Sequence, residues 1–173
     1  MPTNAAPSHP TAHRDRALAL LEFAHGQTRT LIRDFPHDKL THQPSPTDNH
    51  ALWTIGHLAT GYAWFKSLLD GKMHPLPETY NALFGMGSKP VSDPKVYPPF
   101  EQVSKHSEEA YAALLAAARA QTDADLVAPT AADAHGFARD RLDAIEKTAW
   151  HEGWHAGQLA GIRKALGLKP TIG

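Results

Sequence analysis

The sequence contains no cysteine among its 173 residues. Disulfide bonds, zinc sites with thiolate ligands and a cysteine nucleophile are therefore excluded. Any thiol chemistry would need a thiol that comes from a co-substrate. An excess of positive charge is missing as well, because the formal net charge is −1 with neutral histidines. Nucleic-acid-binding domains usually carry a basic face, so we expect no nucleic-acid partner.

Long apolar runs are also missing. No segment approaches the roughly 18 consecutive apolar residues that a membrane-spanning helix needs. The opening stretch MPTNAAPSHPTAHRDRA lacks the apolar core of a signal peptide. We therefore expect no membrane partner and a cytoplasmic location. Residues 1–10 are predicted to form a disordered tail, and residues 11–173 are long enough for a single domain.

No segment has a convincing strand pattern, whereas helical periodicity recurs four times. Apolar residues at three- and four-residue spacing predict helices over residues 11–35, 50–70, 99–121 and 140–166. The segment 71–98 is rich in proline and glycine, yet its apolar content favours an ordered loop that packs on the body. The predicted fold is therefore all-α: a bundle of four helices with long crossover connections.

Several residue types mark the ends of these helices. Thr11 is the candidate N-cap of the first helix, and Asp48 or Asn49 is the candidate N-cap of the second. Gly71 and Gly167 stand where a helix ends in a left-handed residue. The stretch TDADL at 122–126 predicts a short capped turn.

Histidine is abundant, with 12 in the chain, and two of them are one helical turn apart in HEGWHAGQLAG at 151–161. Side chains at this spacing share one face of a helix, so His151 and His155 form a candidate metal-binding pair. On the other side of the same helix, glycine recurs every four residues, at 153, 157 and 161. Glycine destabilises a helix, so we expect another helix to approach closely along this stripe.

The letters HEGWH also match the start of a zinc peptidase motif, in which Glu152 would be the general base. A peptidase usually takes its third ligand downstream, and the 18 residues after His155 contain no His, Asp or Glu. The third ligand should therefore lie upstream, and the candidates are His25, His42, His50, His57, His74, His106 and His135. We favour His57, because it lies in the middle of an apolar helix. We expect His50, at the start of that helix, to be more exposed.

Four stretches of the sequence resemble the DinB-like (DinB/YfiT) superfamily: NHALWTIGHLA at 49–59, LFGMGSKP at 83–90, YPP at 97–99 and HEGWHAGQLAGIRKALGL at 151–168. The branch that they resemble is the one that also supplies the N-terminal domain of ergothioneine-synthase-type enzymes. The resemblance implies a four-helix bundle with up-down-down-up connectivity, often dimeric. It also implies a metal held by one histidine of the second helix and two of the fourth. Carried over by motif, these are His57, His151 and His155.

A three-histidine site for a divalent transition metal (zinc, nickel or iron) leads to three functional hypotheses. The first is a metal-dependent enzyme, such as a thiol-dependent transferase or a hydrolase, with a small-molecule substrate and a low-molecular-weight thiol as partner. The second is a non-catalytic metal-binding or stress-response module, and the third, least favoured, is a zinc peptidase. Glu152, Gln158 and Tyr62 are candidates for orienting the imidazoles. The glycine stripe and four tryptophans also suggest a homodimer.

Overall fold

A computed structural model describes residues 9–171. Six α-helices and two short 3-10 helices are the regular elements of this range, and it contains no strand. The all-α prediction is therefore confirmed. The tail predicted for residues 1–10 lies mostly outside the described residues, and its last residue, Pro10, is already helical. Within residues 9–171, no helix has the length and apolar character that crossing a membrane requires.

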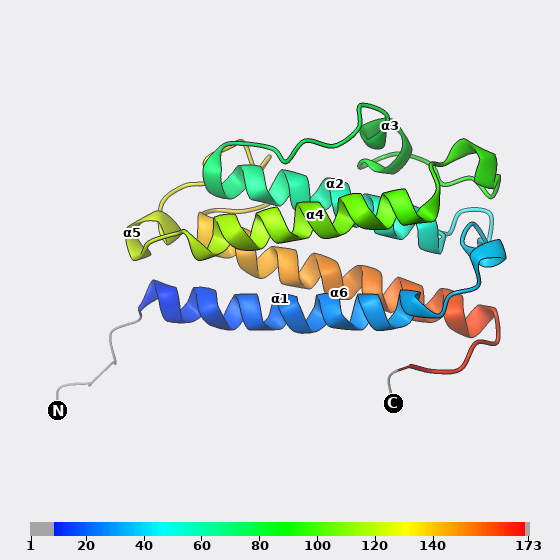
Figure 1. Cartoon of the computed structure of the whole chain (residues 1–173). Helices are drawn as coiled ribbons and strands as arrows, with labels where there is room; N and C mark the ends of the chain where they lie inside the picture. Colours follow the sequence, from blue (N-terminus) through cyan, green and yellow to red (C-terminus); the bar gives the residue numbers. More distant parts are fainter. Residues whose placement is uncertain (1–8, 172–173) are drawn as a thin grey trace.

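Four long helices lie side by side (Figure 1). They are α1 (Pro10–Arg33), α2 (Ala51–Asp70), α4 (Phe100–Arg119) and α6 (Arg141–Ala165). The colour gradient in Figure 1 runs from left to right in α1 and α6 and from right to left in α2 and α4. Hydrogen bonds agree with these directions: Arg14 near the start of α1 donates to the carbonyl of Gln121, just beyond α4.

The helix ends follow ordinary capping chemistry, but the residues predicted to cap α1 and α2 are wrong. Thr11 is not the first cap, because Pro10 begins α1 and suits the first helical position, where no N–H is needed. Neither Asp48 nor Asn49 caps α2; the imidazole of His50 accepts from the backbone N–H of Trp53 instead, at 3.1 Å. The glycine expected after α2 has a left-handed backbone, with φ 77° at Gly71.

The connections carry the shorter helices. The first long one contains η1 (His37–Lys39), and the second contains α3 (Tyr80–Phe84) and η2 (Pro94–Val96). α5 (Asp123–Leu126) corresponds to the capped turn expected at TDADL, with Thr122 and Asp125 forming a reciprocal capping box. The 71–98 segment packs on the body as expected, because Tyr80, Phe84 and Tyr97 are buried against the core.

The core lies between the four long helices and is filled by one apolar stripe from each. Its largest fully buried side chains include Tyr62, Phe65, Leu58, Leu114 and Leu159. Burying a leucine or phenylalanine stabilises a fold by roughly 1.5–3 kcal/mol. The bundle therefore owes its stability mainly to these stripes rather than to helix propensity.

The glycine stripe of α6 departs from the prediction. A Cβ atom added at Gly153, Gly157 or Gly161 would meet no atom of the described residues within 4 Å. The expected close approach of another helix of this chain is therefore wrong at all three positions. The flanking side chains Trp150 and Trp154 are 54% and 56% exposed, so this face of α6 is open and partly aromatic.

The substitution Leu114→Ala tests the packing of this core. Leu114 is 1% exposed in α4, so its truncation should leave a cavity and lower the free energy of unfolding by about 2–5 kcal/mol. The matched control is Leu20→Ala in α1, where the side chain is 57% exposed and the change should stay within about 0.5 kcal/mol. Urea unfolding followed by circular dichroism measures both, and equal losses would contradict this account of the core.

Candidate metal centre

Three imidazoles from two helices converge between α2 and α6. His57 lies in the middle of α2, and His151 and His155 lie one turn apart on α6. The Nε2 atom of His151 is 3.2 Å from Nε2 of His57 and 3.2 Å from Nε2 of His155. Among residues 9–171, this is the group of three or more His, Asp or Glu side chains with donor atoms close enough for one ion. The structure thus brings together the three histidines selected from the sequence.

The ring of His57 is held on its edge and on its face. Its Nδ1 is 2.8 Å from the carbonyl oxygen of Phe84. A carbonyl only accepts hydrogen bonds, so Nδ1 carries the proton and Nε2 of the neutral ring is an unprotonated lone pair. The indole of Trp53 stacks on the imidazole with ring centroids 4.6 Å apart. Both contacts turn the Nε2 lone pair toward α6.

The ring of His155 is oriented by a side chain of its own helix. Its Nδ1 lies 2.9 Å from Oε1 of Gln158, and the same oxygen accepts from the amide of Asn49 at 3.2 Å. An oxygen that already accepts from Asn49 also accepts from Nδ1 of His155, which leaves Nε2 of His155 unprotonated. Gln158 thus contacts a candidate ligand directly, and Asn49 connects it to the start of α2.

The ring of His151 fits against a glycine. A Cβ atom added at Gly61 of α2 would lie 3.0 Å from Cε1 of His151, which is tighter than ordinary van der Waals contact. The missing side chain at position 61 therefore leaves the space in which this imidazole approaches α2. Nδ1 of His151 is buried and has no hydrogen-bond partner among the described residues.

Burial keeps these imidazoles neutral. It lowers the pKa of His151 to about 3, with further contributions from the neighbouring His155 and His57. Burial, followed by the charge of His57, lowers the pKa of His155 to about 4. The pKa of His57 is lowered by burial as well, against an opposing contribution from the hydrogen bond to Phe84. At neutral pH all three rings are therefore uncharged, and each has one N–H and one nitrogen lone pair.

This arrangement fits a divalent metal ion. The Nε2 atoms of His57 and His155 are both acceptors facing Nε2 of His151. A neutral His151 donates to at most one of them, so at least one lone pair in the cluster lacks a donor. Nitrogens bound about 2.0–2.1 Å from a zinc ion lie roughly 3 Å from one another, which is close to the observed spacing. A cation would satisfy the converging lone pairs.

Glu152 belongs to a separate buried cluster. Its side chain is fully buried, and its carboxylate accepts from the hydroxyl of Thr28 at 2.6 Å and from the hydroxyl of Tyr62. Nδ1 of His25 lies 3.5 Å from the same carboxylate. Burial and the Glu152 charge raise the pKa of Tyr62 well above its usual range, so this hydroxyl keeps its proton and donates it.

Two of the candidates for orienting the imidazoles therefore have other partners. The hydrogen bonds of Glu152 and Tyr62 connect these two residues to each other and to α1, and none of them reaches a ring of the three-histidine cluster. The ring of His57 is oriented instead by the carbonyl of Phe84 and by the indole of Trp53. A backbone carbonyl has no sequence signature, although LFGMGSKP had marked the loop that contains it.

The other upstream histidines lie elsewhere. His25 belongs to the Glu152 cluster, and His106 bonds to the hydroxyl of Tyr80 at 2.7 Å. The exposure expected for His50 is wrong, because its ring is fully buried while it caps α2 and its Nε2 lies 3.1 Å from the carbonyl of Val91. Burial lowers the pKa of His50 to about 4.

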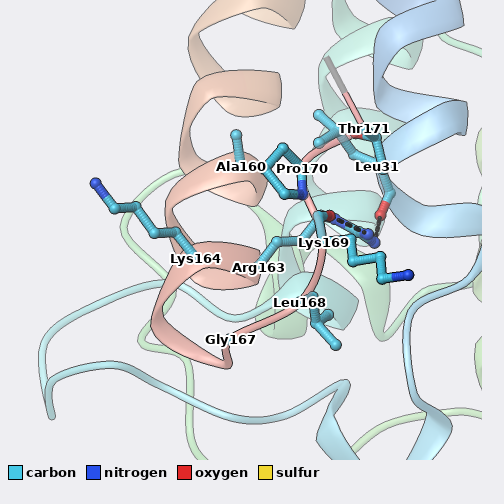
Figure 2. A pocket seen from close by; sticks show the side chains of 9 residues that line it. All are labelled: Leu31, Ala160, Arg163, Lys164, Gly167, Leu168, Lys169, Pro170 and Thr171. Atoms are coloured by element: carbon cyan, nitrogen blue, oxygen red, sulfur yellow. Dashed lines mark hydrogen bonds between the residues drawn. The ribbon is translucent and has the colours of Figure 1, made fainter. Parts of the chain in front are cut away.

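A recess of about 420 Å³ lies at the C-terminal ends of α1 and α6 (Figure 2). The buried guanidinium of Arg163 bonds to the carbonyls of Leu31 and Lys169 and pairs with Asp34. The hydrogen bond from Arg163 lowers the pKa of the Asp34 carboxyl. This guanidinium joins the end of α1 to the segment after α6, and none of the three clustered histidines lines the recess.

A family model described as the DinB superfamily matches residues 20–159. The matched range is more than half of the chain and includes His57, His151 and His155. The match identifies the superfamily without singling out one of its branches. Among curated proteins, none matches the chain.

The neutral imidazoles predict a pH-dependent stability of the metal-free protein. Four of them, His50, His57, His151 and His155, have lowered pKa values in the folded chain. Below an unfolded-state pKa of about 6.5 the unfolded chain binds more protons, so stability should fall as the pH drops from about 6.5 toward 4. Each imidazole adds a slope of at most about 1.4 kcal/mol per pH unit.

Urea midpoints measured between about pH 7 and about pH 4.5 check this dependence. The substitution His151→Gln should make it shallower, because it removes one neutral imidazole whose pKa lies far below that of the unfolded chain. A wild-type midpoint that stays constant across this range would contradict the assignment of neutral rings.

Proposed function

The chain belongs to the DinB superfamily, and from this premise we propose that it is a metal-dependent enzyme whose divalent ion is held by His57, His151 and His155. One observation carries the proposal: three neutral imidazoles turn their Nε2 atoms toward one point. Zinc, nickel and iron are the candidate ions, because imidazole suits all three. The partner would be a small-molecule substrate.

A divalent ion at this point would supply Lewis acidity, which lowers the pKa of a bound water or thiol so that it is a nucleophile at neutral pH. The chain's own residues hold the ligands for this purpose. The Phe84 carbonyl and the Trp53 ring orient His57, and Gln158 orients His155. The rings of His57 and His151 are half-buried rather than sealed, which favours a site that a substrate reaches.

The reaction class that we propose is a thiol-dependent transfer or a hydrolysis. The absence of cysteine supports an external, low-molecular-weight thiol, since the chain has none of its own. Within the superfamily, the motifs at 49–59, 83–90 and 151–168 favour the branch that supplies the N-terminal domain of ergothioneine-synthase-type enzymes. Up-down-down-up connectivity is part of the same proposal, and the helix directions in Figure 1 support it.

The alternatives differ in what they require of the site. A structural metal in a non-catalytic or stress-response module would be closed to substrate, and its removal would cost much of the folding stability. A zinc peptidase would need Glu152 as a base beside the ion. The carboxylate of Glu152 is fully buried and accepts from Thr28 and Tyr62, which counts against this role.

We also propose a homodimer formed through the open face of α6. Gly153, Gly157 and Gly161 form a strip without side chains, and the half-exposed rings of Trp150 and Trp154 border it. Glycines let two backbones approach closely, and tryptophans contribute large apolar areas to interfaces. Because none of residues 9–171 covers this strip, a second copy is the contact that it fits.

Elemental analysis of protein purified without a histidine tag or chelator tests the metal site. We expect about one divalent transition metal ion per chain, and near-complete loss of it in His57→Ala and in His155→Ala, because each substitution removes one of three ligands. The matched control is His74→Ala, which removes an imidazole outside the cluster and should keep the ion.

Two other outcomes have different meanings. A wild-type protein that holds no ion even after reconstitution would overturn the enzyme proposal. An ion that is lost together with most of the folding stability would favour the structural alternative. Thermal unfolding of the stripped and reloaded protein provides that second measurement.

Size-exclusion chromatography with light scattering tests the dimer. The wild type should elute with twice the mass of one chain at micromolar concentration, and Gly157→Glu should elute as a monomer because it places a charge in the middle of the glycine strip. The control Val127→Glu changes an exposed residue outside α6 and should remain dimeric. A monomeric wild type would rule the proposal out.

A further inference from the structure

Gly56 is a buried glycine of α2 that lies directly against the ring of Phe84. A Cβ atom added there would lie 2.5 Å from Cγ and 2.6 Å from Cε1 of Phe84. Real Cβ atoms do not approach other atoms so closely, so no larger residue fits at position 56 while Phe84 keeps its place. The residue next in sequence is the candidate ligand His57.

Phe84 is the last residue of α3, which lies against α2 (Figure 1). Its ring is fully buried and stacks on Tyr97 with centroids 5.6 Å apart, while Tyr80 meets it edge to face at 5.1 Å. The ring is thus held by two aromatic neighbours of the 71–98 segment and by the backbone of α2. The position of Phe84 along α2 follows from this packing.

The carbonyl of Phe84 is free for a partner outside its helix, because the last carbonyls of a helix lack intrahelical donors. It accepts from Nδ1 of His57 at 2.8 Å. The same segment also holds the residue that stacks on His57, since the indole N–H of Trp53 donates to the hydroxyl of Ser88 at 2.9 Å. The edge and the face of the His57 ring are therefore both controlled from the 71–98 segment.

We propose that Phe84 and Gly56 are positioning residues: the ring of Phe84, seated on the glycine, places the carbonyl that keeps the proton of His57 on Nδ1 and its Nε2 lone pair directed at the ion. The 71–98 segment is in this sense part of the metal site, although none of its residues is a ligand. This inference rests on the proposed metal site, but its first readout needs no ion.

The substitution Gly56→Ala tests the inference. The added methyl group displaces the Phe84 ring and moves its carbonyl away from His57. In the metal-free protein, nitrogen-15 NMR of the imidazoles should show His57 with its proton on Nδ1 in the wild type and a mixture of both tautomers in the variant. Competition with a chelator should show that the variant binds zinc about 10–100-fold more weakly, as for other losses of a hydrogen bond to a metal-binding histidine.

The matched control is Gly26→Ala. This substitution also adds a methyl group to a helical glycine, but a Cβ atom at position 26 meets no atom of residues 9–171 within 4 Å. It should leave both the tautomer and the zinc affinity at wild-type values. Circular dichroism verifies that each variant keeps its helices.

Phe84→Ala and the double variant Gly56→Ala/Phe84→Ala complete a double-mutant cycle, in which the zinc affinities of the single and double variants are compared. With the ring removed, the methyl group at position 56 no longer displaces anything, so the double variant should bind zinc as weakly as Phe84→Ala and no more weakly. The double variant also has room for the methyl group, so it keeps the test decisive if Gly56→Ala alone does not fold.

The outcomes distinguish the metal site itself from the positioning role of Phe84. A wild type that binds none of zinc, nickel and iron would overturn the proposed function, while the tautomer of His57 would still test the role of Phe84. A Gly56→Ala variant with wild-type tautomer and wild-type zinc affinity would overturn the positioning role and leave the metal site standing. Additive losses in the cycle would also overturn it, because two independent defects would then be at work.

Discussion

The packing of α2 against α6 is the contact on which the rest of the structure depends. One of the three candidate ligands comes from α2 and two come from α6, so the cluster exists only where the two helices meet. Gly61 lets the ring of His151 approach α2, and Gly56 lets α3 approach it on another side. A polar cluster of this kind would be costly inside a core unless its groups are paired or bind an ion. Gly61 thus leaves room for an imidazole of the cluster, and Gly56 leaves room for the Phe84 ring beside it.

A second polar cluster fixes the rotation of α6. Glu152 lies between His151 and His155 in sequence but faces α1 and Tyr62, where Thr28 and Tyr62 donate to its carboxylate. A buried carboxylate that lost these donors would be strongly destabilising. These hydrogen bonds fix the rotation of α6 about its axis. The histidine pair therefore keeps facing His57 of α2. The HEGWH stretch thus has two faces with different partners, and the glutamate of the peptidase-like letters serves the packing of α1 rather than the histidine cluster.

Local patterns were sufficient to predict the helices and to select three histidines that lie together in the structure. The periodic apolar residues identified all four long helices to within a few residues, and a mid-helix histidine in an apolar stretch marked His57. Contacts between distant segments were harder to predict. The Phe84 carbonyl is backbone and leaves no mark on the sequence, and the partners of Glu152 lie on α1 and α2. The glycine spacing in α6 led to a wrong prediction, because no helix of the described residues covers that face. Such a spacing does not indicate whether the same chain or a second one would cover it.

The three-histidine cluster offers a metal ion nitrogen atoms only, and this has a consequence for redox conditions. A thiolate ligand can be oxidised to sulfenic acid or joined in a disulfide, which releases its metal. Imidazole is not on that ladder, and the chain has no cysteine anywhere. Among the described methionines, the most exposed is Met86 at 92%, and it lies in the 71–98 segment rather than in the three-histidine cluster. Oxidation to sulfenic acid or to a disulfide therefore has no thiolate to act on in the three-histidine cluster.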